Sequence, residues 1–147
     1  MEWRHGEYTI TDDIDRVDLE AVISLLSDSY WAKNRPADKT VVAVKHSLCF
    51  NLLLGDTQVG FARVVTDRAT FAWICDVIIH PDHRGQGLGK WLMSCIDERL
   101  SEMDVQQLLK TRDAHSFYRS FGFDRSECMS KPSPSWLMRQ GSNSGRQ

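Results

Sequence analysis

The sequence lacks three features that would each indicate a particular class of protein: a long apolar run, a strong excess of one charge, and closely spaced cysteines. No run approaches the roughly 20 apolar residues that cross a bilayer, and the first ten residues lack the apolar segment of a signal peptide. The net charge is −2 over 147 residues and lysine and arginine are scattered, which gives no reason to expect a nucleic-acid surface. We therefore expect a cytoplasmic protein without membrane or nucleic-acid partners.

Cysteine is sparse and widely spaced, and no C-x-x-C pair is present. The four cysteines are Cys49, Cys75, Cys95 and Cys128. Most lie in apolar stretches, where a thiol behaves as a small hydrophobic group, so we expect reduced core residues. A reactive Cys75 or Cys95 is the alternative, but neither has a neighbouring histidine or cationic cluster that would favour a thiolate. His80 and His83 form at most half of a metal site, so no metal is expected.

Length and composition favour one domain. A chain of 147 residues can cover one sizeable core and is too short for two ordinary domains. Its hydrophobic content of 41% and charged content of 26% are ordinary for a globular protein. We assign residues 1–140 to the domain and the polar residues 141–147 to a tail that has nothing to bury.

The order of predicted elements indicates an α/β fold with helices on both faces of a sheet. After a first strand, Asp15 can cap a helix that carries apolar residues at helical spacing from Val17 to Leu26. Residues 40–47 fit a helix or a strand, and we predict a helix. The expected strands are 7–10, the hairpin 48–65 around Gly55, the buried run 71–79, 105–111 and an edge strand at 135–139. The further helices are 88–103 and 114–121.

The most informative stretch is HPDHRGQGLGKWLM, residues 80–93, in which three glycines follow an arginine. An apolar strand, a proline and glycines that open a helix place unpaired backbone N–H groups around one point, where the helix dipole adds positive charge. Glycine also permits positive φ and lets a phosphate approach without meeting a Cβ atom. The spacing fits neither a P-loop, since Trp91 follows Lys90, nor a dinucleotide fingerprint. An anion-binding turn is favoured over a tight turn without a ligand.

Two motifs in this order resemble those of one family. R-G-Q-G-L-G, residues 84–89, matches [RQ]-x-x-G-x-[GA], and A-H-S-F-Y-R-S-F-G-F, residues 114–123, resembles A-x-x-[FL]-Y-x-x-x-G-F. Both are motifs of the GNAT superfamily of N-acetyltransferases, and V-I-I-H-P before the first motif is similar to the preceding strand of that family. With the order of elements, the resemblance covers about residues 5–139.

The resemblance implies a mixed, mostly antiparallel sheet of six or seven strands, splayed between its fourth and fifth strands, with acetyl-coenzyme A in the split. It also implies that the backbone of Ile78 and Ile79 binds the pantetheine arm. The family often places an asparagine that meets the cofactor three residues before the alanine of the second motif; Thr111 stands there instead, which puts that contact in question. The expected diphosphate site consists of Arg84, Gly85, Gln86, Gly87, Leu88, Gly89 and Lys90.

Acetyl transfer needs a neutral amine, stabilisation of a developing oxyanion and a proton for the departing thiolate. Tyr118 resembles the general acid of the family, and a phenol with a pKa near ~10 is a reasonable donor. A core tyrosine is the alternative, although Phe117 and Phe121 can fill that role.

Asp76 is a carboxylate inside the apolar strand 71–79, where an unpaired buried charge is strongly unfavourable. Its position on the predicted fourth strand suggests a role in the cleft, where it binds a cationic amine or passes its proton through water. The alternative is an ion pair with an arginine such as Arg63.

Tyr30 and Trp31 fall where the resemblance places a loop that walls the acceptor pocket, and they are expected to contact substrate or to staple the helix to the sheet. Phe50, Arg63 and Phe71 are weaker candidates for the same wall. Taken together, the sequence predicts acetyl transfer from acetyl-coenzyme A to a small-molecule amine by direct attack in a ternary complex. The alternatives are a non-catalytic acyl-coenzyme A sensor and a protein-lysine or N-terminal acetyltransferase. Residues 136–138, Trp-Leu-Met, could pair two copies into a homodimer.

Overall fold

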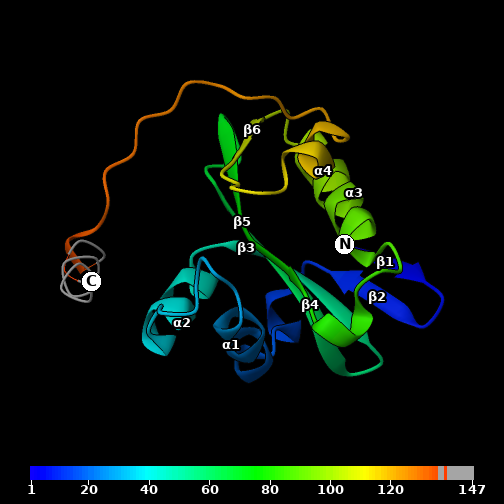
Figure 1. The fold of residues 1–147 in the computed structure, drawn as a ribbon. Helices are drawn as coiled ribbons and strands as arrows, with labels where there is room; N and C mark the ends of the chain where they lie inside the picture. Colours follow the sequence, from blue (N-terminus) through cyan, green and yellow to red (C-terminus); the bar gives the residue numbers. More distant parts are fainter. Residues whose placement is uncertain (136–137, 139–147) are drawn as a thin grey trace.

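The computed structural model describes residues 1–135 and residue 138. Within them, six strands form one sheet in the order β1-β2-β3-β4-β5-β6 (Figure 1). The strands are β1 (Glu2–His5), β2 (Tyr8–Thr11), β3 (Leu48–Leu54), β4 (Thr57–Thr66), β5 (Phe71–Ile79) and β6 (Gln106–Leu109). The helices are η1 (Ile14–Arg16), α1 (Leu19–Ser27), α2 (Ala37–Lys45), η2 (Pro81–His83), α3 (Leu88–Ser101) and α4 (His115–Arg119).

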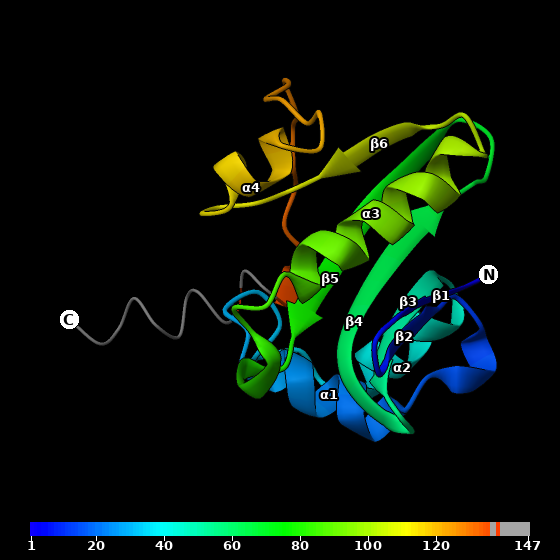
Figure 2. The same cartoon turned by 90° about the vertical axis from the view of Figure 1, so that its right-hand side faces the viewer.

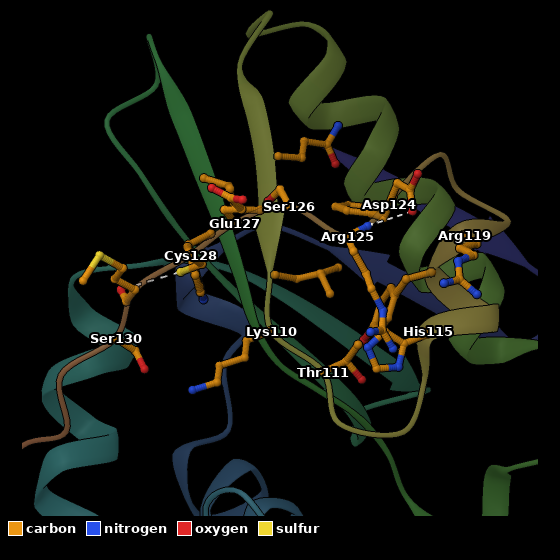
Figure 3. A pocket seen from close by; sticks show the side chains of 17 residues that line it. Lys110, Thr111, His115, Arg119, Asp124, Arg125, Ser126, Glu127, Cys128 and Ser130 are labelled. Atoms are coloured by element: carbon orange, nitrogen blue, oxygen red, sulfur yellow. Dashed lines mark hydrogen bonds between the residues drawn. The ribbon is translucent and has the colours of Figure 1, made fainter.

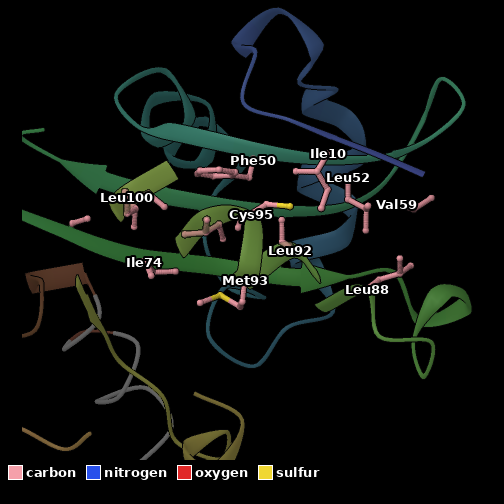
Figure 4. Packing of buried hydrophobic residues seen from close by; sticks show 14 residues of the cluster. Ile10, Phe50, Leu52, Val59, Ile74, Leu88, Leu92, Met93, Cys95 and Leu100 are labelled. Carbon is pink, nitrogen blue, oxygen red and sulfur yellow. The ribbon is translucent and has the colours of Figure 1, made fainter. Parts of the chain in front are cut away.

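The helices cover both faces of the sheet, as predicted. α1 and α2 lie on one face and α3 on the other (Figure 1). The larger core packs one side of α3 against the strands, including Ile10, Phe50 and Ile74 (Figure 4). Its buried α3 residues include Leu88, Leu92, Cys95, Ile96 and Leu100. These are the apolar positions that predicted this helix, and their burial provides most of the drive for it to form.

A smaller core lies between α1, α2 and the opposite face of the sheet. Val22, Leu25 and Leu26 of α1 are buried there with Phe61 of β4 and Ile78 of β5. Among the described helices, none combines the length and apolar character needed to span a bilayer.

Strand β5 has two different halves. Its first half, Phe71–Ile74, pairs with β4 on one side and runs parallel to Gln106–Leu109 of β6 on the other. Its second half, Cys75–Ile79, pairs with β4 but has no β6 partner within residues 1–135. Figure 2 shows β6 diverging from β5 in this direction. The sheet is therefore mixed and splayed between the predicted fourth and fifth strands, which are β5 and β6.

A β-bulge lies near the start of the second half. Two residues of β5, Asp76 and Val77, lie opposite the single residue Ala62 of β4, and Asp76 has a positive φ of 52°. The extra residue reverses the alternation of side chains. Ile74 therefore packs toward α3, whereas Ile78, four residues later, packs toward α1.

Three local predictions need correction. Asp18, not Asp15, caps α1: its side chain accepts a hydrogen bond from the backbone N–H of Ala21 at 3.1 Å. The first strand is the second half of a hairpin, because Glu2–His5 pairs with Tyr8–Thr11 around Gly6. Cys128 is exposed, so the core assignment of the cysteines fails there, while all four are free thiols.

The C-terminal predictions lie mostly outside the described residues. Of the expected edge strand 135–139, Ser135 and residue 138 are described, and both have helical backbone in place of an extended one. The proposed pairing surface at 136–138 and the tail at 141–147 lie outside the described residues, apart from residue 138.

Candidate functional site at the divergence of β5 and β6

The glycine stretch forms a left-handed turn into α3. Gly85 and Gly87 have φ values of 82° and 80°, and a Cβ atom built on either would meet no atom within 4 Å. The backbone conformation, and not crowding, therefore requires glycine at these two positions. Gly89 is different, since it has no positive φ and its built Cβ would lie 3.9 Å from Cγ1 of Ile79.

The turn leaves backbone donors available. Trp91 is the first residue of α3 whose N–H finds an intrahelical acceptor, the carbonyl of Gly87 at 3.0 Å. The N–H groups of Leu88, Gly89 and Lys90 consequently have no partner in the helix. They lie at the positive end of a 14-residue helix, which is a favourable place for an anion.

A cavity of about 580 Å³ lies against this turn. Its lining includes ten of the predicted site residues: Tyr30, Trp31, Ile78, Ile79, Arg84, Gly85, Gly87, Leu88, Gly89 and Lys90. It therefore joins the glycine turn, the unpaired half of β5 and the α1–α2 loop in one space. The sequence reasoning missed other lining residues, among them Val77, His83, Asp113 and Phe117. Only His83 had a local signal, since it directly precedes the arginine of the motif.

Two side chains of the turn, Gln86 and Arg84, form hydrogen bonds that brace it. Gln86 donates a hydrogen bond to the carbonyl of His83 at 3.2 Å and contacts the hydroxyl of Tyr8 at 3.4 Å. Gln86 is thus a brace and not a lining residue. Arg84 donates from Nε to the carbonyl of Ile79 at 2.9 Å, which places its guanidinium at the end of β5 beside the cavity.

Asp76 forms a buried ionic cluster with two arginines. Its carboxylate, only 2% exposed, accepts hydrogen bonds from Arg35 at 2.8 and 3.1 Å and from Arg63 at 2.9 Å. The indole Nε1 of Trp31 donates a further bond at 3.0 Å. Burial alone would raise the pKa of Asp76, but the hydrogen bonds and charges of Arg35 and Arg63 outweigh it and hold the pKa below its ordinary value. The ion pair foreseen as an alternative is present, and it leaves Asp76 a poor proton acceptor.

Tyr118 lies on α4, on the other side of the split. Its ring packs edge-on against Phe117 at a centroid distance of 5.1 Å and against Phe123 at 6.0 Å. Burial raises the pKa of Tyr118, and Tyr30 and Asp113 raise it further, so the hydroxyl stays protonated at neutral pH.

A second cavity, of about 710 Å³, lies along β6 (Figure 3). Tyr118, Thr111 and His115 line it, and residues 124–130 close its other side. Thr111 is therefore separate from the glycine turn, and its hydroxyl accepts a hydrogen bond from the N–H of Ala114 at 3.1 Å. The neighbours Phe117 and Tyr118 line the first and second cavity respectively, so the two cavities approach each other at α4.

Three predicted wall residues lie elsewhere. Phe50 is 0% exposed in the core against α3, so its assignment to the substrate wall is wrong. Phe71 begins β5 opposite Gln106, in the half of the strand that is paired on both sides. The guanidinium of Arg63 is held by Asp76 and by the hydroxyl of Ser47, the latter at 3.2 Å. Neither Phe71 nor Arg63 lines either cavity.

Comparison with known proteins gives a consistent result. A family model for the acetyltransferase (GNAT) domain matches residues 38–125, which include the glycine turn and Tyr118. A protein of Gibberella zeae named as an acetyltransferase is 31% identical over 143 residues, covering 82% of this chain and 81% of that protein. An uncharacterized N-acetyltransferase of Porphyra purpurea, ycf52, is 37% identical over 120 residues, covering 77% of this chain and 67% of that one.

A solved structure supports the same relationship. The crystal structure of a protein of Xanthomonas campestris that belongs to the GNAT family is 34% identical to this chain, with a TM-score of 0.81. The match covers 88% of this chain and 95% of that one. The similarity therefore extends over nearly the whole described fold.

Proposed function

The chain belongs to the GNAT superfamily of acetyltransferases, and we propose that it transfers the acetyl group of acetyl-coenzyme A to an amine of a small-molecule acceptor by direct attack while both are bound. The observation that carries this proposal is the pair of left-handed glycines, Gly85 and Gly87, which open α3 beside the unpaired half of β5. A turn of this kind fits a diphosphate next to an extended arm.

The residues present fit coenzyme A. The free N–H groups of Leu88, Gly89 and Lys90 and the charge of Arg84 would hold the diphosphate, with each charge-assisted hydrogen bond contributing roughly 1.5–3 kcal/mol. The backbone of Ile78 and Ile79, on the edge of β5 that β6 leaves unpaired, would hold the pantetheine arm. When bound, acetyl-coenzyme A supplies an activated acetyl thioester.

The acceptor amine has to lose a proton before it attacks. An alkylamine with a pKa of ~10.4 needs roughly 4.6 kcal/mol to be deprotonated at pH 7, so the site must assist. Asp76 is unsuited as a direct base because two arginines hold its charge. We assign the role of proton acceptor to water at the opening of the cavity. Tyr118 stays protonated because its pKa is raised, and it adjoins Phe117, which lines the coenzyme cavity, so it would supply a proton to the sulfur that leaves.

The test is the release of free thiol from acetyl-coenzyme A across a panel of primary amines, run with wild type and Tyr118→Phe. We expect release with at least one small amine, and we expect Tyr118→Phe to lower kcat by ~10²-fold while calorimetry shows an unchanged Kd for coenzyme A. An unchanged kcat would remove Tyr118 from the chemistry. Tight coenzyme binding without release would indicate a sensor module, and release with lysine peptides alone would indicate a protein acetyltransferase.

A further inference from the structure

The loop between α1 and α2, residues 28–36, forms one wall of the cavity beside the glycine turn. Ser29, Tyr30 and Trp31 line this wall. The loop is not part of the sheet, and its start is held by local bonds such as that from the N–H of Ala32 to the hydroxyl of Ser29 at 3.1 Å. Tyr30 and Trp31 are 44% and 43% exposed, so burial alone does not hold the two rings in place. Ala32, the next residue, is 5% exposed and packs in the smaller core, which holds the backbone of the loop but leaves the two rings to contacts outside it.

Asp76 provides a charged, hydrogen-bonded attachment of this loop to the sheet. Its carboxylate receives Nε1 of Trp31 from the middle of the loop and the guanidinium of Arg35 from its end. Asp76 sits on the bulge of β5, two residues after Ile74, where the pairing with β6 ends. The loop is therefore attached to the strand at the beginning of the split.

The charge balance makes this attachment depend on the carboxylate. Two guanidinium groups, of Arg35 and Arg63, share one carboxylate in a largely buried site. Arg63 has a second partner in Ser47 and belongs to β4, so it stays in place without Asp76. Arg35 would then face Arg63 without a counter-charge and would move to water together with the loop.

The opposite side of the loop has a weaker attachment. The hydroxyl of Tyr30 lies 3.5 Å from Oδ1 of Asp113, and the guanidinium carbon of Arg112 lies 4.1 Å from the centre of the Tyr30 ring. Both partners belong to the segment between β6 and α4, across the split, and all three side chains are exposed. Exposed contacts of this kind are weak and exchange readily with water.

We propose that Asp76 is a positioning residue: through Trp31 and Arg35 it fixes the α1–α2 loop as the acceptor wall, while the Tyr30 contact can open and close. This inference rests on the proposed function for its link to the acceptor. The position of the loop itself can be measured without any acceptor.

Asp76→Asn tests the inference, with Asp12→Asn as the matched control. Asp12 also forms a partly buried ion pair, with Arg99 at 3.1 Å, but lies on the far side of the core from the loop. Trypsin cleavage after Lys33, followed by mass spectrometry, reports whether the loop has detached. We expect Asp76→Asn to speed this cleavage at least tenfold and to raise the KM of the most reactive amine of the panel at least tenfold, with coenzyme A Kd changed less than threefold. Asp12→Asn should leave all three values within twofold.

Trp31→Phe provides a second variant in case Asp76→Asn fails to fold, since it removes the indole N–H and part of the ring of a side chain that is 43% exposed. It should move cleavage and KM in the same direction by two- to fivefold. If both variants leave the Lys33 site protected, the positioning role is refuted. A fall in kcat at unchanged KM, with the loop still protected, would refute it in favour of a role in proton transfer. If wild type releases no thiol with any amine, the proposed function fails, while the cleavage assay still decides whether Asp76 holds the loop.

Discussion

Apart from Asp76, the two halves of β5 are equally apolar in sequence, and they differ in what surrounds them. Phe71–Ile74 has a strand on each side, so its backbone hydrogen bonds are used within the sheet. Cys75–Ile79 has β4 on one side and the cavity on the other. A single strand thus serves as core and as an unpaired edge beside the cavity, and the change begins after Ile74, where the pairing with β6 ends.

The difference shows that side-chain character does not reveal which part of a buried strand is functional. The available backbone of the second half comes from the shortness of β6, whose four residues end opposite Ile74. The site exists because a neighbouring strand ends, and only the glycine turn that follows β5 marks it in the sequence.

The largest expected effect is a difference in stability between a substitution in the first half of β5 and one in the second half. Ile74, 4% exposed, packs against α3, and Ile74→Ala should lower the free energy of unfolding by about 3 kcal/mol through the cavity it leaves, with coenzyme A affinity unchanged. Ile79→Ala, in the second half of β5, should lower the free energy of unfolding by only about 1 kcal/mol, because Ile79 is partly buried. It should also weaken coenzyme A binding, because Ile79 lines the cavity. Urea denaturation and calorimetry measure both. Equal destabilisation by the two variants would remove the distinction.

A second experiment changes the backbone of the glycine turn, which follows the second half of β5. Gly87→Val places a β-branched residue where φ is 80°, which costs about 2 kcal/mol. The free turn should relieve this strain by leaving the left-handed conformation, and coenzyme A binding has to restore it, so affinity should fall by about thirtyfold. Gly6, in the β1–β2 hairpin, has a φ of 59° and equally open surroundings, so Gly6→Val imposes similar strain far from the cavity. If Gly6→Val weakened binding as much, the loss would reflect general destabilisation and not the turn.

The smallest expected effect is the pH dependence of the stability that Asp76 contributes. Because Asp76 has a lowered pKa in the folded protein, its contribution to stability is fully present above the unfolded pKa of ~3.9 and is lost as pH falls through the folded pKa. The difference in unfolding free energy between wild type and Asp76→Asn should therefore shrink between pH 5 and pH 2, by about 1.4 kcal/mol per unit of pKa lowering. Urea denaturation at several pH values measures this. A difference that stays constant with pH would show that the ion pair contributes nothing.

Local patterns predicted the elements whose causes are local. The glycine turn needs two left-handed residues, and the sequence displays them; α3 carries an apolar face that can be read directly. The cap of α1 shows where local reading ends, because Asp12, Asp13, Asp15 and Asp18 are all suitable residues within seven positions. Asp18 takes the role because Gln58 of β4 accepts its backbone N–H at 2.8 Å, a contact 40 residues away in sequence.

Distance in sequence also explains the errors at the site. Phe50 and Cys49 are neighbours on β3, yet one packs toward α3 and the other toward α1, and the sequence does not say which face is which. Arg35 is 41 residues from Asp76, so its part in the ionic cluster has no local sign. The sequence suggested Arg63 as a partner because β4 and β5 adjoin.

The bulge at Asp76 and Val77 lets β5 present one extra side chain without changing the phase of the residues that follow it. Removing one of the two residues would restore regular pleating and leave Ile78 opposite Phe61, so Ile78 would still pack toward α1 and Ile79 toward α3. The glycine turn would therefore leave the strand in the same orientation. A chain without Asp76 would keep the turn in place and lose only the carboxylate that Trp31 and Arg35 contact.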